Sequence, residues 1–300
     1  MITIRQQCAM LVKEPSAMDL AETAARMCYR SYRPDKDDYD QTKFLKALAS
    51  KGHLTPFEHS WLCVPISDDH LDAKDKQQLE HIAQMSGRPR SDVEWDIILD
   101  TCVASMRTFI EVLGVDAAFE LFKDHDMRCN GYYTFDIITN RAIANQLIRH
   151  RSLSFDNTWE LPEFSVNQES LRWVKQEDPS VCLGKEYVDI LNNDPGTKQD
   201  WMHSITQSFE TYRHLCDRYS KQFARSVLPL CTTTHIMMTG NGHTWVKFLE
   251  LRLGQGAEPP AKELAHDIFD QLKPFLTADD GYDPEKEPFR SALFGPGTVS

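Results

Sequence analysis

Polar and basic residues that could bind a phosphorylated ligand are concentrated in the stretch RHRSLSFDNTWELPEFSVNQESLRW, residues 149–173. An Arg-His-Arg triplet opens this stretch, and the polar run SVNQESLRW closes it. Guanidinium groups match phosphate oxygens two at a time, while hydroxyl and amide groups supply neutral hydrogen bonds. Taken alone, the triplet and the polar run are each more typical of a solvated charged surface. They indicate an anion site only in combination with other motifs of the chain.

The loop GHLTPFEH, residues 52–59, contains two histidines, a threonine and a glutamate together with a glycine and a proline. Histidine and glutamate are good metal ligands, but Pro56 and the spacing HxxxxEH do not fit a helical zinc motif. A polar structural loop is the alternative. A metal-dependent hydrolase would use the side chains of His53, Glu58, His59 and His150.

Two further segments carry candidate ligand-binding residues. The first is ARSVLP with Arg225, and the second is TGNGHTWVKFLELRLG with Arg252 near its end. Arg252 lies among Phe248, Leu249 and Leu251, and an arginine in such an apolar helix must reach solvent or find a partner. A ligand phosphate or carbonyl would be such a partner.

The spacing of apolar residues predicts the elements that must position these motifs. Strands are expected at 59–67, 132–138 and 234–242. Helices are expected at 16–34, with Ser16 as the N-cap, and at 41–52, 74–85, 96–114, 116–125, 138–151, 201–223, 245–254 and 260–276. The aromatic stripe of 201–223 is expected to lie in the core. The sequence therefore predicts an α/β (α+β) domain over residues 1–300, with a mixed sheet flanked by long helices. A helical insertion is expected at about 68–130 and a loosely held tail at about 278–300.

Composition restricts the partners. The chain has 300 residues and a net charge of −12, which disfavours nucleic acid or an anionic membrane as a partner. None of the eight cysteines forms a CxxC pair, and most lie in apolar contexts, which indicates reduced thiols. Neither a signal peptide nor a transmembrane run is recognisable, so a cytoplasmic protein is expected.

In this order, GHLTPFEH, YTFDIITNRAIANQLIRHR, SVNQESLRW, ARSVLP and NGHTWVKFLELR resemble the motifs of the flavin-dependent thymidylate synthase family. The resemblance covers most of residues 15–275 apart from the acidic segment. It implies a homotetramer that binds FAD at subunit interfaces and methylates dUMP, a pyrimidine deoxynucleotide monophosphate. Methylenetetrahydrofolate would donate the carbon and NADPH the reducing equivalents.

The resemblance also implies residue roles. Arg252 would be catalytic, stabilising negative charge that develops at the edge of the pyrimidine ring. The nucleotide would be bound by Gln146, Arg149, Gln168, Glu169, Ser170, Arg172, Arg225 and Arg252. The cofactor would be bound by His53, Thr55, Arg149, His150, Arg151, Gln168, Asn241, His243 and Lys247. No metal site is implied.

The chain departs from the family pattern at several positions. A second insertion, at about 154–164, separates the Arg-His-Arg triplet from SVNQESLRW. His243 stands where the family has arginine, and Lys247 stands where it often has asparagine. Glu258 takes the place of a glutamine, and a carboxylate there could accept a hydrogen bond from a cytosine amino group. Methylation or hydroxymethylation of dCMP or dUMP is therefore an alternative, as is an inactive nucleotide-binding assembly module.

Overall fold

A computed structural model describes residues 2–13, 16–31, 39–65, 67–84, 93–96, 101–126, 128–152, 164–177 and 179–294. The second insertion expected from the sequence, at about 154–164, lies outside the described residues except for Phe164. The side chain of Arg151 is likewise outside the description.

The centre of the fold is a four-stranded antiparallel sheet with the order β2-β6-β9-β7. Its strands are β2 (Cys8–Leu11), β6 (Tyr132–Asn140), β9 (Thr233–Asn241) and β7 (Ser165–Gln168). The two central strands pair over their whole length, from Tyr132 opposite Asn241 to Asn140 opposite Thr233. A parallel pair, β1 (Thr3–Gln6) with β8 (Ser180–Leu183), forms a second small sheet. The chain thus contains both parallel and antiparallel pairs, which confirms the α/β class.

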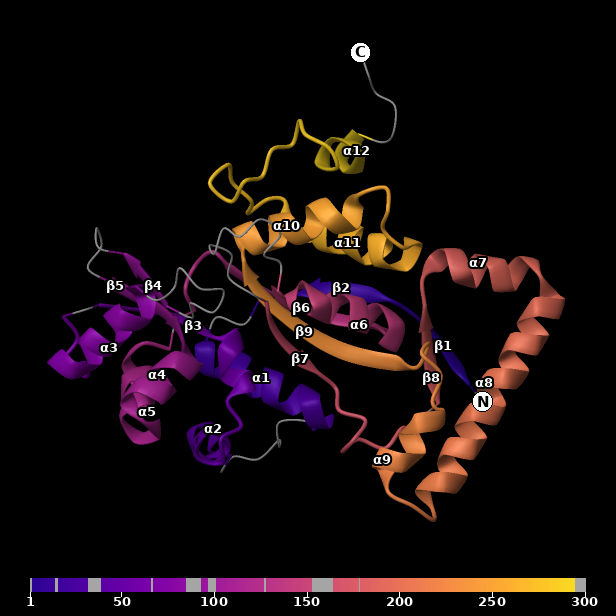
Figure 1. Cartoon of the computed structure of the whole chain (residues 1–300), viewed down its shortest axis with the longest axis horizontal. Coiled ribbons are helices and arrows are strands. Elements are labelled where there is room, and N and C mark those ends of the chain that lie inside the picture. The colour runs from indigo at the N-terminus through magenta and orange to yellow at the C-terminus, as the bar shows by residue number, and fades with distance from the viewer. Residues whose placement is uncertain are drawn as a thin grey trace.

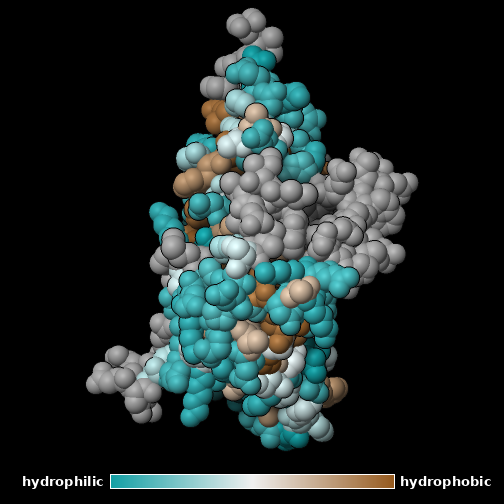
Figure 2. Space-filling model, turned by 90° about the vertical axis from the view of Figure 1, so that its left-hand side faces the viewer, coloured by the Kyte–Doolittle hydropathy of each residue, from teal (hydrophilic) through white to brown (hydrophobic). Residues whose placement is uncertain are grey.

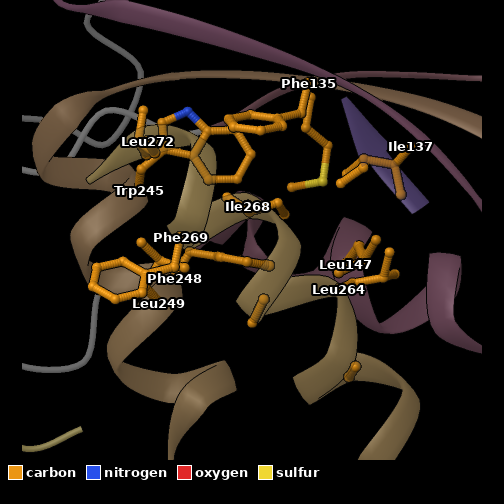
Figure 3. Close-up of a cluster of buried hydrophobic side chains, with 14 of the residues drawn as sticks. Phe135, Ile137, Leu147, Trp245, Phe248, Leu249, Leu264, Ile268, Phe269 and Leu272 are labelled. Carbon is orange, nitrogen blue, oxygen red and sulfur yellow. The ribbon is translucent and has the colours of Figure 1, made fainter. Parts of the chain in front are cut away.

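Helices cover both faces of the central sheet (Figure 1). One face is covered by α6 (Arg141–Ile148), α10 (Gly242–Leu253) and α11 (Pro259–Leu272), and the other by α1 (Ala17–Tyr29). Figure 3 shows the core between the sheet and α10 and α11, where Phe135 and Trp245 meet edge to face at 4.9 Å. Burial of these large side chains fixes the two helices on the strands that carry the candidate residues.

Local signals account for α1 and α2. The side chain of Ser16 accepts a hydrogen bond from the Asp19 backbone at 3.2 Å, as the expected N-cap, which satisfies one free amide of the first turn. Helix α2 (Gln41–Ser50) begins with the analogous Asp40 cap and is followed by Gly52 at φ 75°. The 3₁₀ helix η1 (Thr55–His59) then leads into β3 (Trp61–Pro65).

The acidic segment between β3 and β6 contains helices and also strands. Its helices are α3 (Ala73–Gln84), α4 (Met106–Leu113) and α5 (Val115–Asp124), and its strands are β4 (Val93–Asp96) and β5 (Thr101–Ser105). The prediction of one helix over 96–114 is wrong for 101–105, because β5 pairs with both β3 and β4. This segment has its own buried cluster, and its outer face is mostly hydrophilic with scattered hydrophobic residues (Figure 2).

The end of the molecule opposite that segment is formed by α7 (Lys185–Asn193), α8 (Pro195–Cys216), α9 (Lys221–Ala224) and the 3₁₀ helix η3 (Arg225–Val227) (Figure 1). The expected aromatic stripe is buried at Phe209 and Tyr212 only. Tyr219 and Phe223 lie beyond the end of α8 and are 58% and 53% exposed, so the predicted core stripe is wrong for these two residues.

Tyr282, Phe289, Ala292 and Leu293 pack against the core, although a loosely held tail was expected at about 278–300. Phe289, at the start of α12 (Phe289–Phe294), is 2% exposed and lies 5.5 Å from Phe269 in α11. The eight cysteines are free thiols, and Cys102 and Cys182 are buried. Within the described ranges, none of the helices has the length and the apolar run needed to cross a bilayer.

Candidate active site

The end of α10 presents Arg252 to a half-buried site. The helix follows β9 directly, and the side chain of Asn241 caps it by accepting a 2.9 Å hydrogen bond from the Thr244 backbone. The buried face of α10, which includes Trp245 and Phe248, orients the last turn. A positive charge in the last turn of a helix interacts favourably with the carbonyl end of the helix dipole.

Two residues hold the guanidinium of Arg252, one from α6 and one from the 3₁₀ helix η2 (Arg149–Ser152). Its Nε donates to Nε2 of His150 at 2.7 Å, and its terminal nitrogens donate to the side-chain and backbone oxygens of Gln146 at 3.4 and 3.3 Å. Burial lowers the pKa of Arg252, while the charge of Glu258 opposes this effect. These hydrogen-bond partners are neutral, so the positive charge of Arg252 remains available to a ligand.

His150 is buried in its neutral form. It is 4% exposed, and its ring meets Phe248 edge to face at 4.9 Å. Burial, with the charge of Arg252 as the second cause, lowers the pKa of His150 to about 4. Because Nε2 accepts from Arg252, the proton of the neutral ring is on Nδ1. That Nδ1 is buried and has no hydrogen-bond partner among the described residues, so it is a donor available to a bound group.

A second cluster of arginines forms at the opposite end of α6. Glu169 is 1% exposed and forms an ion pair with Nε of Arg30 at 3.0 Å, and the side chain of Gln176 donates to it at 2.7 Å. Arg141, the first residue of α6, donates to the backbone oxygen of Glu169 at 3.0 Å. Arg30 can turn toward this cluster because it ends α1 in the left-handed conformation, at φ 48°.

The charges around Arg141 do not balance. Burial lowers its pKa; Glu169 opposes this effect, and the positive charges of Arg225 and Arg30 add to it. Three guanidinium groups therefore interact near one buried carboxylate, and Nε of Arg141 is buried without a hydrogen-bond partner in the described part of the chain. An excess of guanidinium groups at a partly buried position is suited to an anion such as a phosphate.

Sequence reasoning missed Arg30 and Arg141. Both lie in segments predicted as helices, and single arginines there carry no spacing signal. Arg30 meets Glu169 only because of the backbone turn after α1. The one available hint was that Arg141 lies in the first turn of a helix predicted to follow a strand.

The polar run after β7 lies partly within this cluster. Gln168 donates to the hydroxyl of Thr234 at 3.3 Å, and the Ser170 backbone donates to the carbonyl of Cys28 at 3.0 Å. The Ser170 hydroxyl accepts from the Arg172 backbone at 3.3 Å. Arg172 and Arg225 are exposed. The structure thus brings Glu169 and Arg225 to the surroundings of Arg141 and leaves the side chain of Arg172 at the surface.

The GHLTPFEH loop does not form a metal centre. His53 and Thr55 are exposed, the buried Glu58 is paired with Arg107, and Nδ1 of His59 lies 2.8 Å from the Thr239 hydroxyl. Over the described ranges, no group of three or more His, Cys, Asp or Glu side chains is arranged to hold a metal ion. His150, the fourth residue of the hydrolase hypothesis, binds Arg252 instead, so the geometry does not support that hypothesis.

The other candidate cofactor residues are dispersed. Asn241 serves as the helix cap, and Nδ1 of His243 lies 3.1 Å from the backbone oxygen of Asp280. Lys247 is half-exposed and forms an ion pair with Glu250 at 3.3 Å. Arg149 is exposed. The structure does not gather these four residues around one internal point, and their cofactor roles remain predictions.

Comparison with known proteins shows what the chain is similar to. Residues 130–276, just under half of the chain, match the Thy1 family model, described as thymidylate synthase complementing protein. This match includes Arg252 and the arginine cluster around Arg141 except for Arg30. Over this part the chain is similar to the flavin-dependent thymidylate synthases.

Individual relatives show the same similarity at modest identity. The chain is 27% identical to the flavin-dependent thymidylate synthase of Corynebacterium glutamicum over 224 residues, 66% of this chain and 86% of that protein. It is 29% identical to a probable flavin-dependent thymidylate synthase of Paramecium bursaria Chlorella virus 1 and 30% identical to the Synechocystis enzyme. These two matches cover 45% and 44% of this chain, and 63% and 61% of the respective relatives.

Solved structures of similar proteins include the UMP/dUMP methylase PolB from Streptomyces cacaoi bound with 5-Br UMP. It superposes with a TM-score of 0.46 and 14% identity over 94% of this chain and 96% of that one.

Proposed function

We propose that the chain methylates dUMP to dTMP, with methylenetetrahydrofolate as the carbon donor, NADPH as the reductant and FAD as the bound cofactor. The observation that carries the proposal is the guanidinium of Arg252, half-buried and hydrogen-bonded to the neutral His150 and Gln146. Carbon 5 of uracil reacts as a nucleophile only when negative charge moves onto the ring's N3 and carbonyl oxygens. A fixed cation at that edge stabilises this charge where it develops.

The second arginine cluster supports a nucleotide as substrate. Arg225, expected to bind the nucleotide from the family resemblance, lies close enough to Arg141 and Arg30 for their charges to interact, whereas the side chain of Arg172 is at the surface. An anion bound there would relieve the repulsion among the three guanidinium groups and satisfy the free Nε of Arg141. In this proposal the phosphate binds at the start of α6 and the pyrimidine ring lies toward Arg252.

His150 fits a role beside a flavin. Its Nδ1 is a buried donor that an acceptor of a flavin ring could satisfy. Arg149, in the same motif, and His53 and Thr55, in GHLTPFEH, have exposed side chains. When bound, flavin supplies the reducing equivalents of the reaction. The protein's own contribution is to hold the neutral imidazole with its proton on Nδ1. A homotetramer with the flavin between subunits, which the family resemblance implies, is also part of the proposal.

Separate incubations with dUMP and with dCMP, each with methylenetetrahydrofolate and NADPH, test the activity by mass spectrometry of the products. Formation of dTMP from dUMP is expected. Methylated or hydroxymethylated dCMP as the sole product would instead favour the alternative suggested by Glu258, whose carboxylate is hydrogen-bonded to Gln146. The purified protein should also show flavin absorption near about 375 and 450 nm, a general property of the oxidised cofactor. A colourless protein with neither activity would contradict the proposal.

A further inference from the structure

Glu258, at the N-cap of α11, is connected to Arg252 through a chain of hydrogen bonds. Its Oε2 accepts a hydrogen bond from Nε2 of Gln146, and its Oε1 accepts one from the Tyr187 hydroxyl of α7 at 3.2 Å. Gln146 in turn presents its side-chain oxygen to Arg252 at 3.4 Å. The chain thus crosses from α7 through α11 and α6 to α10.

The chemistry of the end groups fixes the direction of every bond in this chain. A carboxylate only accepts hydrogen bonds, and a guanidinium only donates them. The amide of Gln146 between them must therefore point its nitrogen at Glu258 and its oxygen at Arg252. A glutamine at position 258, as in the family pattern, could still accept from Gln146, but a neutral amide oxygen accepts more weakly than a carboxylate and would hold Gln146 less firmly.

Neighbouring contacts hold Glu258 in place. The buried side chain of Gln7 donates to the backbone oxygen of Pro260 at 2.7 Å. A Cβ on Gly184, just before α7, would lie 2.9 Å from the side chain of Pro260, so α7 approaches the start of α11 closely. The charge of Glu258 also raises the pKa of Tyr187, after burial as the larger cause.

We infer that Glu258 is a positioning residue that orients the Gln146 amide and thereby holds Arg252 at the pyrimidine edge, with Tyr187 supporting the carboxylate. The inference rests on the proposed role of Arg252. In this view the carboxylate of Glu258 orients Arg252, the arginine that activates the substrate, and does not contact the base directly.

The test compares Glu258→Leu, Glu258→Gln and Tyr187→Phe with a matched control, Glu263→Gln. Glu263 also connects α11 to α7, because it accepts a 2.7 Å hydrogen bond from the Lys185 backbone, but the described contacts of Gln146 do not include it. We expect Glu258→Leu to lower kcat by tenfold or more, since a misplacement of about 1 Å can cost about a hundredfold, with KM for dUMP changing far less. Glu258→Gln keeps an acceptor for Gln146 and should recover most of kcat, and Tyr187→Phe should lower kcat modestly.

A second measurement is independent of turnover. The imidazole NMR signals of His150, assigned with His150→Asn, report the environment of Arg252 directly. They should shift in Glu258→Leu, shift much less in Glu258→Gln and stay in place in Glu263→Gln. Equal effects of Glu258→Leu and Glu263→Gln on kcat would show that only the docking of α7 matters and would overturn the inference. Unchanged His150 signals in Glu258→Leu would overturn it too. A wild-type protein that converts neither nucleotide would refute the proposed function, while the NMR comparison would still test the chain of bonds.

Discussion

Nε of Arg252 donates a 2.7 Å hydrogen bond to Nε2 of His150 across 102 residues of sequence. This contact joins the Arg-His-Arg motif to the late arginine of α10. It also requires His150 to be unprotonated on Nε2, so the charge state of one residue controls the geometry of the other.

Removal of Arg252 should abolish turnover and spare the cofactor. For Arg252→Ala we expect kcat to fall by at least about a hundredfold, the cost of losing one preorganised group that stabilises developing charge. Bound flavin, measured by absorbance, should stay at the wild-type level. Arg213→Ala is the control, because Arg213 also lies in the last turn of a helix but is exposed. Parallel loss of flavin and activity in Arg252→Ala would indicate a structural role instead.

Protonation of His150 should destabilise the fold in mild acid. Its pKa in the folded chain is lowered to about 4 from the ordinary histidine value of 6.5, so the unfolded chain binds more protons between these values. The free energy of unfolding should therefore fall as the pH drops from about 6.5 toward 4, by at most about 3 kcal/mol for this group. Urea unfolding at several pH values measures this. His150→Asn should show a flatter pH dependence over the same window; an identical slope would contradict the assignment.

Arg225→Ala should weaken binding of the nucleotide phosphate. We expect the affinity for dUMP to drop by about tenfold to a hundredfold, consistent with about 1.5–3 kcal/mol for hydrogen bonds to a charged group. Calorimetry with dUMP and with deoxyuridine separates the phosphate from the base. If the variant loses affinity for deoxyuridine to the same extent, Arg225 does not act on the phosphate.

Asp68 should stabilise the inserted segment through two histidines. Burial alone would raise its pKa, but hydrogen bonds from the His70 backbone, from His125 and from the His70 ring outweigh burial and lower it to about 2. Because the pKa is lowered in the folded chain, this stabilisation is present above pH 3.8 and is lost as the pH falls through about 2. Asp68→Asn should cost about 1–3 kcal/mol at neutral pH, measured by thermal unfolding. Asp69→Asn, an exposed neighbour, is the control; equal effects would exclude a specific contact.

Phe289→Ala should destabilise the domain by about 3–5 kcal/mol, as expected for a large side chain removed from a packed core. Phe289 is 2% exposed. The exposed Tyr219 provides the control, since Tyr219→Ala should change stability by no more than about 0.5 kcal/mol. Chemical denaturation of both variants decides, and a small effect of Phe289→Ala would mean that residues 278–294 do not contribute to the core.

Sequence reasoning succeeded where a feature depends on neighbouring residues. The Ser16 cap of α1 could be predicted because a hydroxyl before a helical stripe satisfies the first free amides. The strand–helix order around Arg252 also followed from apolar spacing. Arg225 was a candidate from its segment alone, but only the family resemblance gave it a role at the nucleotide, and only the resemblance singled out Gln146.

The rest depended on contacts between distant segments. Residues 101–105 have helix-like apolar spacing, but β5 forms because β3 and β4 offer strand partners. Phe289 is buried against Phe269 of α11. The Pro- and Gly-rich sequence around Phe289 gives no indication of this contact. Arg30 joins Glu169 across 139 residues of sequence only through a left-handed backbone turn, a conformation that no residue type there specifies.

Helix α6 begins at Arg141 and carries Gln146 five residues later. At a rise of about 1.5 Å per residue, these two positions are about 7.5 Å apart along the helix axis. In the proposed binding mode, this rigid stretch of about one and a half helical turns would set the distance between the bound phosphate and the pyrimidine ring. The site would then favour ligands whose phosphate and ring are separated by this distance, without a conformational change of the protein. A proline or a one-residue deletion inside α6 would alter the position of Arg141 relative to Gln146.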